Sequence, residues 1–167
     1  MEETNKASGE RLTATLNLRD PRGIHCRVSA LLAYRLRVEA PSAEVTLYTP
    51  ERRQADPKRP LQTINLGARH SLVITVEATG DDAAKAMEIV RSVVEREPLS
   101  REEVVEAIPE GESGEIGEIR ARQQRLIQEE QDKADYDRWI SPGGWLWELI
   151  GPEQLGYGSD EPEDEEV

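Results

Sequence analysis

Alternation between apolar and polar residues is the strongest constraint on the fold of this chain. In residues 11–18, 43–49 and 72–78, almost every second residue is apolar. Successive side chains of a strand point to opposite faces, so each segment predicts a strand with one buried face. Such strands fit an antiparallel sheet with helices on one side and water on the other. Residues 51–55 add a short edge strand after a turn at Pro50.

Three other segments have the apolar spacing of helices. Residues 26–38 follow a turn at 20–23, residues 58–66 are closed by Gly67, and the last helix begins after Gly80. The order βαββαβα predicts an α+β open-faced sandwich, a four-stranded antiparallel sheet with three helices on one face. The stripes expected to be buried are Val28, Leu31, Leu32 and Leu36 in the first helix, and Ala83, Met87, Val90 and Val94 in the last.

The balance of charge changes near Pro98. Residues 10–98 hold 14 Lys and Arg against 12 Asp and Glu, whereas residues 99–167 hold 6 against 20. The acidic part argues against nucleic-acid binding, which needs a basic surface. The slightly basic part suits an anionic partner or phosphate.

Several classes of protein are disfavoured by what the sequence lacks. No apolar run approaches the roughly 20 residues that span a bilayer, and the polar N-terminus has no signal-peptide pattern. One cysteine excludes an internal disulfide, so we expect a cytoplasmic protein. Two histidines and one cysteine do not form a metal-ligand set, and we expect no metal and no bound cofactor.

The composition divides the chain into five regions. We expect a disordered N-terminus (1–9), a folded domain (10–98), a linker (99–114), a helical extension (115–151) and an acidic disordered tail (152–167). The extension reads as a charged helix with few apolar positions, then a break at Ser141–Gly144 and an apolar cluster at Trp145–Ile150. A shortened chain of residues 1–98 is expected to fold alone.

A chemical motif, Gly23-Ile24-His25-Cys26-Arg27, lies where the first strand pattern gives way to the first helix pattern. The free N–H groups of a helix N-terminus carry about half a positive charge and favour anions. A cation there opposes the dipole, so Arg27 is best explained by an anion partner. A histidine that becomes phosphorylated needs this environment, although an ordinary surface histidine remains the alternative for His25. Cys26 reads as a small turn residue, with a lowered thiol pKa as the less favoured alternative.

This order of elements, with Gly-Ile-His-x-Arg at the first strand-to-helix junction, resembles HPr, the histidine phosphocarrier of the bacterial phosphoenolpyruvate:sugar phosphotransferase system. The resemblance covers residues 10–97. It implies that His25 accepts a phosphoryl group on Nδ1, that Arg27 steadies it, and that the backbone N–H groups of Cys26 and Arg27 bind it. It implies a carrier in a relay rather than a stand-alone enzyme.

The resemblance also implies partners and a pathway. An enzyme I-like phosphohistidine protein would be the donor, phosphoenolpyruvate the upstream source, and a IIA-type protein the acceptor, in sugar transport or nitrogen regulation. We expect partner binding through Arg59 and Leu61, and through Trp145 and Trp147, since Trp often anchors interfaces. The cluster that holds these two tryptophans could equally dock on its own domain.

Two departures from the family pattern bear on function. Val28 stands where the family usually has Pro, and Pro is preset for a helix's first turn. Arg59 stands where many members have a regulatory serine, so regulation by a kinase there is not expected. The alternative function is a non-catalytic regulatory or interaction protein that reuses the HPr surface.

Overall fold

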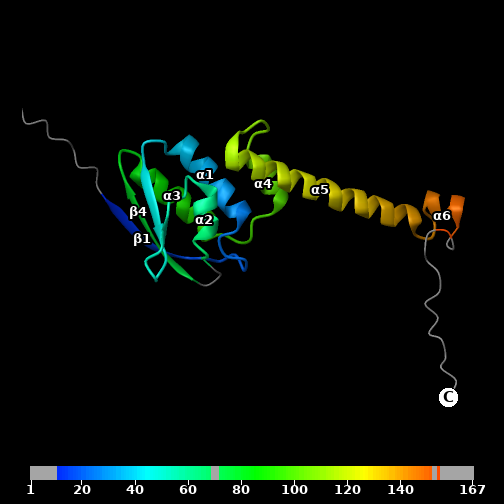
Figure 1. Ribbon diagram of the computed structural model, residues 1–167, viewed down its shortest axis with the longest axis horizontal. Coiled ribbons are helices and arrows are strands. Elements are labelled where there is room, and N and C mark those ends of the chain that lie inside the picture. Colours follow the sequence, from blue (N-terminus) through cyan, green and yellow to red (C-terminus); the bar gives the residue numbers. More distant parts are fainter. Residues whose placement is uncertain (1–10, 69–71, 152–153, 155–167) are drawn as a thin grey trace, which may run out of the picture. The chain divides into compact units, whose positions relative to one another are not determined.

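Four antiparallel strands form one sheet in the order β1-β4-β2-β3. Figure 1 labels β1 and β4 of this sheet. The computed structural model describes residues 11–68, 72–151 and 154. The expected disordered ends, 1–9 and 152–167, lie outside the described residues except for Gln154. The strands are β1 (Leu12–Asn17), β2 (Glu44–Tyr48), β3 (Gln54–Ala55) and β4 (Val73–Thr79).

The register of the strands explains the alternation in the sequence. Leu16 pairs with Ile74, and Leu47 pairs with Val76. All four side chains are buried. The paired residues on the opposite face, such as Thr13 and Glu77, are more exposed. The predicted α+β fold with one covered face is confirmed.

A layer of three helices covers that face of the sheet (Figure 1). They are α1 (Cys26–Glu39), α2 (Pro60–Asn65) and α3 (Ala83–Val94). Every predicted stripe residue of α1 is buried. In α3 the predicted residues Ala83, Val90 and Val94 are buried and Met87 is partly buried. Gly80, before α3, has φ +100°, and a Cβ there would lie 2.3 Å from the Ser42 carbonyl oxygen. This close approach explains why the chain has glycine at that turn.

The expected linker contains a helix, so that prediction needs correction. α4 (Arg101–Ala107) begins with a capping box in which Ser100 and Glu103 bond each other's backbone N–H. Leu99, Val104 and Ile108 are buried in the same core as the sheet. The boundary expected at Pro98 therefore falls inside a continuous core.

The long helix α5 (Gly114–Ile140) starts against the same core. Ile116 is fully buried there, and Ile119 packs against it. The Arg120 guanidinium donates to the carbonyl oxygens of Val105 and Ile108 at the end of α4, as cations often do at helix C-termini. The apolar positions of this helix were expected to be too few for a core face, but these two isoleucines suffice at its N-terminal end.

The chain divides into two compact units, Met1–Arg125 and Leu126–Val167. In the second unit, the rest of α5 is followed by a turn and α6 (Trp145–Ile150). The rings of Trp139 and Trp145 lie 5.8 Å apart. No helix in the described part of the chain is long and apolar enough to cross a membrane.

Candidate functional site

The turn before α1 is fixed by Asp20-Pro21-Arg22-Gly23. The Gly23 N–H donates to the Asp20 carbonyl at 2.9 Å, and the Arg22 N–H donates to the Asp20 side chain at 2.9 Å. Asp first, Pro second and Gly fourth are favoured residues of such turns. Ile24 then inserts into the core, and its N–H donates to the Ala68 carbonyl at 3.1 Å. These local contacts set the direction in which the chain enters α1.

His25 is the N-cap residue of α1, and both ring nitrogens have partners. Nδ1 accepts from the backbone N–H of Arg27 at 3.3 Å. Nε2 lies 2.8 Å from Oδ2 of Asp20. The imidazole therefore stands between the helix N-terminus and a carboxylate, with its side chain 16% exposed.

Asp20 was read in the sequence only as part of a turn, yet it is the nearest charged group to the histidine. Burial is the largest influence on the pKa of this carboxyl and raises it. Hydrogen bonds from the Arg22 backbone, His25 and the Arg22 guanidinium outweigh burial and lower the pKa from 3.8 to about 2. Asp20 is therefore an anion at neutral pH.

Arg27 and Cys26 lie in the first turn of α1, beside the imidazole. The half-buried Arg27 makes no ion pair with any residue that the structure describes. Its guanidinium is thus available to an anion. The Cys26 thiol contacts the side-chain amide of the buried Gln123 at 3.7 Å.

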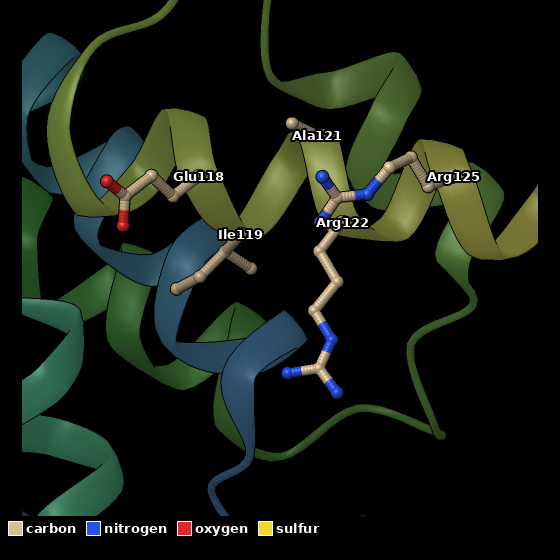
Figure 2. Close-up of a pocket in the computed structure, with 5 residues that line it drawn as sticks. All are labelled: Glu118, Ile119, Ala121, Arg122 and Arg125. Carbon is tan, nitrogen blue, oxygen red and sulfur yellow. The ribbon is translucent and has the colours of Figure 1, made fainter.

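That contact brings α5 to the start of α1. Figure 2 shows the side chains of Ile119 and Arg122 extending from α5 toward the ribbon of α1. They belong to an open cavity of about 410 Å³ lined by Glu118, Ile119, Ala121, Arg122 and Arg125. The first unit therefore presents Arg122 and Arg125 on the same stretch of α5 that carries Gln123, a placement that the sequence pattern does not predict.

Arg59 and Leu61, the first pair expected to bind partners, lie at the start of α2. Leu61 is 53% exposed. Its backbone N–H donates to the Glu115 carboxylate of α5 at 3.2 Å. The Arg59 side chain is exposed and lies 3.9 Å from Asp56. The exposed side chains leave this corner accessible, while α5 already satisfies part of its backbone.

Trp145 and Trp147, the second pair, lie on α6 in the other unit. Trp145 is 56% exposed, and Trp147 is half-buried. Exposed Leu149 extends the apolar surface on the same short helix. Among the described residues, no cluster of side chains that could hold a metal occurs.

His25 thus caps the first helix of an α+β sandwich whose sheet has four antiparallel strands. The family model described as the PTS HPr component phosphorylation site matches residues 12–96. This is half of the chain, so the chain belongs to the HPr family.

Solved structures of HPr proteins are similar to about half of this chain. The phosphocarrier protein HPr from Bacillus anthracis str. Ames is 18% identical, with a TM-score of 0.46, and the alignment covers 50% of this chain and 96% of that one. HPr from Thermoanaerobacter tengcongensis is 19% identical, with a TM-score of 0.46, and the alignment covers 50% of this chain and 91% of that one. The histidine-containing phosphocarrier protein of a mycoplasma is 21% identical, with a TM-score of 0.45, and the alignment covers 49% of this chain and 90% of that one. No curated protein matches the chain.

Proposed function

We propose that this protein relays a phosphoryl group through Nδ1 of His25. One observation carries the proposal: Nε2 is held by Asp20, while Nδ1 faces the N-terminus of α1. The nitrogen that is free of the carboxylate is thus the one beside preorganised N–H donors. Those donors favour the negative charge of a phosphoryl group.

The transfer requires only a change of partner at phosphorus. The lone pair of His25 Nδ1 forms a new N–P bond as the P–N bond of the donor's phosphohistidine breaks. The donor imidazole leaves with that electron pair, so no proton has to be lost. The Arg27 N–H, which bonds Nδ1 in the resting protein, would then donate to a phosphoryl oxygen, as would the Cys26 N–H. The Arg27 guanidinium would neutralise charge in a loose transition state.

The partners follow from membership of the HPr family. We propose an enzyme I-like phosphohistidine protein as donor and a IIA-type protein as acceptor, in the cytoplasm. Arg59 and Leu61, at the start of α2, would contact these proteins, and Trp145 and Trp147 would anchor a further protein. Offering IIA proteins of the sugar and of the nitrogen-regulatory branch separately would identify the pathway.

The direct test is to incubate the full chain with phosphoenolpyruvate and enzyme I and to detect acid-labile phosphate on His25. His25→Ala should abolish labelling, whereas His70→Ala, at the chain's other histidine, should retain it. Arg27→Ala should slow transfer about 100-fold, the scale of losing one preorganised electrostatic contact. Arg37→Ala, in the last turn of the same helix, is the matched control and should be neutral. Labelling of the His25→Ala protein would refute the assignment.

A second candidate function is a binding protein that reuses the HPr surface without phosphoryl transfer. The low exposure of His25 and the contact of Gln123 with Cys26 favour it, because a donor must reach the imidazole past α5. A chain that binds enzyme I but accepts no phosphate from it would decide for this candidate.

A further inference from the structure

We propose that Asp20 is a positioning residue for His25, which holds the imidazole in the neutral tautomer with the proton on Nε2 and the lone pair on Nδ1. The proposal rests on the proposed function of His25. It adds a residue that the sequence motif does not contain, because Asp20 precedes Gly23 and lies outside Gly-Ile-His-x-Arg.

The carboxylate of Asp20 is held in one orientation. Oδ1 accepts from the backbone N–H of Arg22 at 2.9 Å and from its Nε at 3.2 Å. Oδ2 accepts from Arg22 Nη2 at 3.3 Å and lies 2.8 Å from His25 Nε2. The Asp20 side chain is only 7% exposed, so water cannot easily replace these donors. Three contacts from one neighbour thus aim Oδ2 at the histidine.

Both hydrogen-bond partners of the imidazole require the same tautomer. An ionised carboxylate can only accept, so Nε2 must carry the proton that it donates to Asp20. A backbone N–H can only donate, so Nδ1 must offer its lone pair to the Arg27 N–H. The neutral ring satisfies both contacts only with the proton on Nε2. The opposite tautomer would place two lone pairs together at Asp20 and two hydrogens together at Arg27.

The same contact has a role after transfer. When Nδ1 takes the phosphoryl group and Nε2 keeps its proton, the ring becomes a cation. Asp20 lies at hydrogen-bond distance from that charge and stabilises it, as the aspartate of a Ser-His-Asp triad stabilises imidazolium. Asp20 would therefore favour both the attacking form of His25 and its phosphorylated form.

Asp20→Asn is the informative substitution because it keeps the size of the side chain. Asparagine has one acceptor oxygen, and the Arg22 donors compete for it. If that oxygen turns to Arg22, the amide hydrogens face Nε2, which must then accept and release its proton to Nδ1. Asp56→Asn is the matched control. Asp56 precedes Pro57 and Lys58, and its Oδ1 accepts from the Lys58 N–H at 2.9 Å, but its contacts include no histidine.

Two measurements test the proposal, and the first needs no phosphoryl transfer. Nitrogen-15 NMR of the unphosphorylated full chain, with His70→Ala to assign the signals, should show a protonated Nε2 and an unprotonated Nδ1 at a pH where His25 is neutral. Asp20→Asn should shift this balance, and Asp56→Asn should not. A wild-type ring with its proton on Nδ1 overturns the proposal, whether or not His25 accepts phosphate.

The second measurement is the single-turnover rate of phosphorylation by enzyme I. Asp20→Asn should lower it about 10- to 100-fold, the scale seen when the group that orients a metal-binding histidine is removed. Asp56→Asn should match the wild type. Equal rates for Asp20→Asn and wild type overturn the positioning role, while absence of labelling in the wild type itself overturns the proposed function instead.

Discussion

Ile116→Ala tests whether the start of α5 belongs to the carrier core. Ile116 is fully buried, with a relative accessibility of 0%. The substitution removes three carbons, worth about 2.4 kcal/mol at about 0.8 kcal/mol for each buried methylene. The cavity left behind brings the usual cost for a buried aliphatic residue to about 2–5 kcal/mol. We expect the free energy of unfolding of the first unit to fall by this amount.

Hydrogen exchange gives the measurement, since the slowest amides of a core strand report global unfolding. The amides of Ile74 and Val76 in β4 lie far from residue 116 in sequence, and their protection should fall by the full amount. Leu149→Ala is the control, because Leu149 is 73% exposed on α6 and surface changes usually stay within about 0.5 kcal/mol. Unchanged protection of β4 in the Ile116→Ala protein would contradict the reasoning and restore a boundary near Pro98.

Three further predictions follow from other parts of the first unit. The pKa of Asp20 is about 2 in the folded protein against an ordinary 3.8, so the ionised carboxylate stabilises the fold by about 2 kcal/mol. This contribution should be complete above about pH 4 and lost as the pH falls through 2. The free energy of unfolding, measured against pH in acid, should show this slope in the wild type and not in Asp20→Asn. Gly80→Ala should destabilise the fold more than Gly111→Ala in urea unfolding, because both have positive φ but only Gly80 also meets a carbonyl oxygen; equal losses would mean that strain alone matters. Val28→Pro should change the unfolding free energy by less than about 1 kcal/mol, because N–H groups in a helix's first turn lack intrahelical acceptors; a larger loss would show that the Val28 N–H is bonded.

The shortened chain of residues 1–98 is now expected to fold poorly. It lacks Leu99, Val104, Ile108 and Ile116, all buried in the shared core. At about 1.5–3 kcal/mol for each buried side chain, their loss approaches the about 5–15 kcal/mol that stabilises a whole domain. A chain of residues 1–125 keeps all four and should fold, which circular dichroism of the two proteins can compare.

The sheet and the three helices over it could be predicted because their signals are local. Alternation sets the strands, Asp-Pro-x-Gly sets the turn before α1, and together they place His25 at a helix N-terminus. The capping box at Ser100 and Glu103 was also local and would have predicted α4 inside the expected linker. The pattern alone did not predict this helix because α4 has only seven residues, too few for a repeating apolar stripe.

Other features depend on contacts between distant residues, which a single sequence does not reveal. The burial of Ile116 could be predicted only from the shape of the core surface against which it packs. The contact of Glu115 with Leu61 joins residues 54 positions apart. The pairing of Asp20 with His25 spans only five positions, but it depends on the side-chain direction that Arg22 imposes. An aspartate that opens the turn five residues before the motif histidine is the sequence signal that could have found this pair.

Arg22 also has a consequence for how this protein can be altered by recombination. Its Nη2 donates to the Leu99 carbonyl at 3.5 Å as well as to Asp20. Arg22, which orients the Asp20 carboxylate, therefore also contacts Leu99, which lies beyond the residues 12–96 that match the HPr family model. A chimera that exchanged everything after residue 96 for the end of another carrier would disturb a contact of the arginine that holds Asp20. Such a graft would have to bring its own support for that arginine. The segment after residue 96 is therefore coupled to the motif through Arg22 and cannot be exchanged as an independent part.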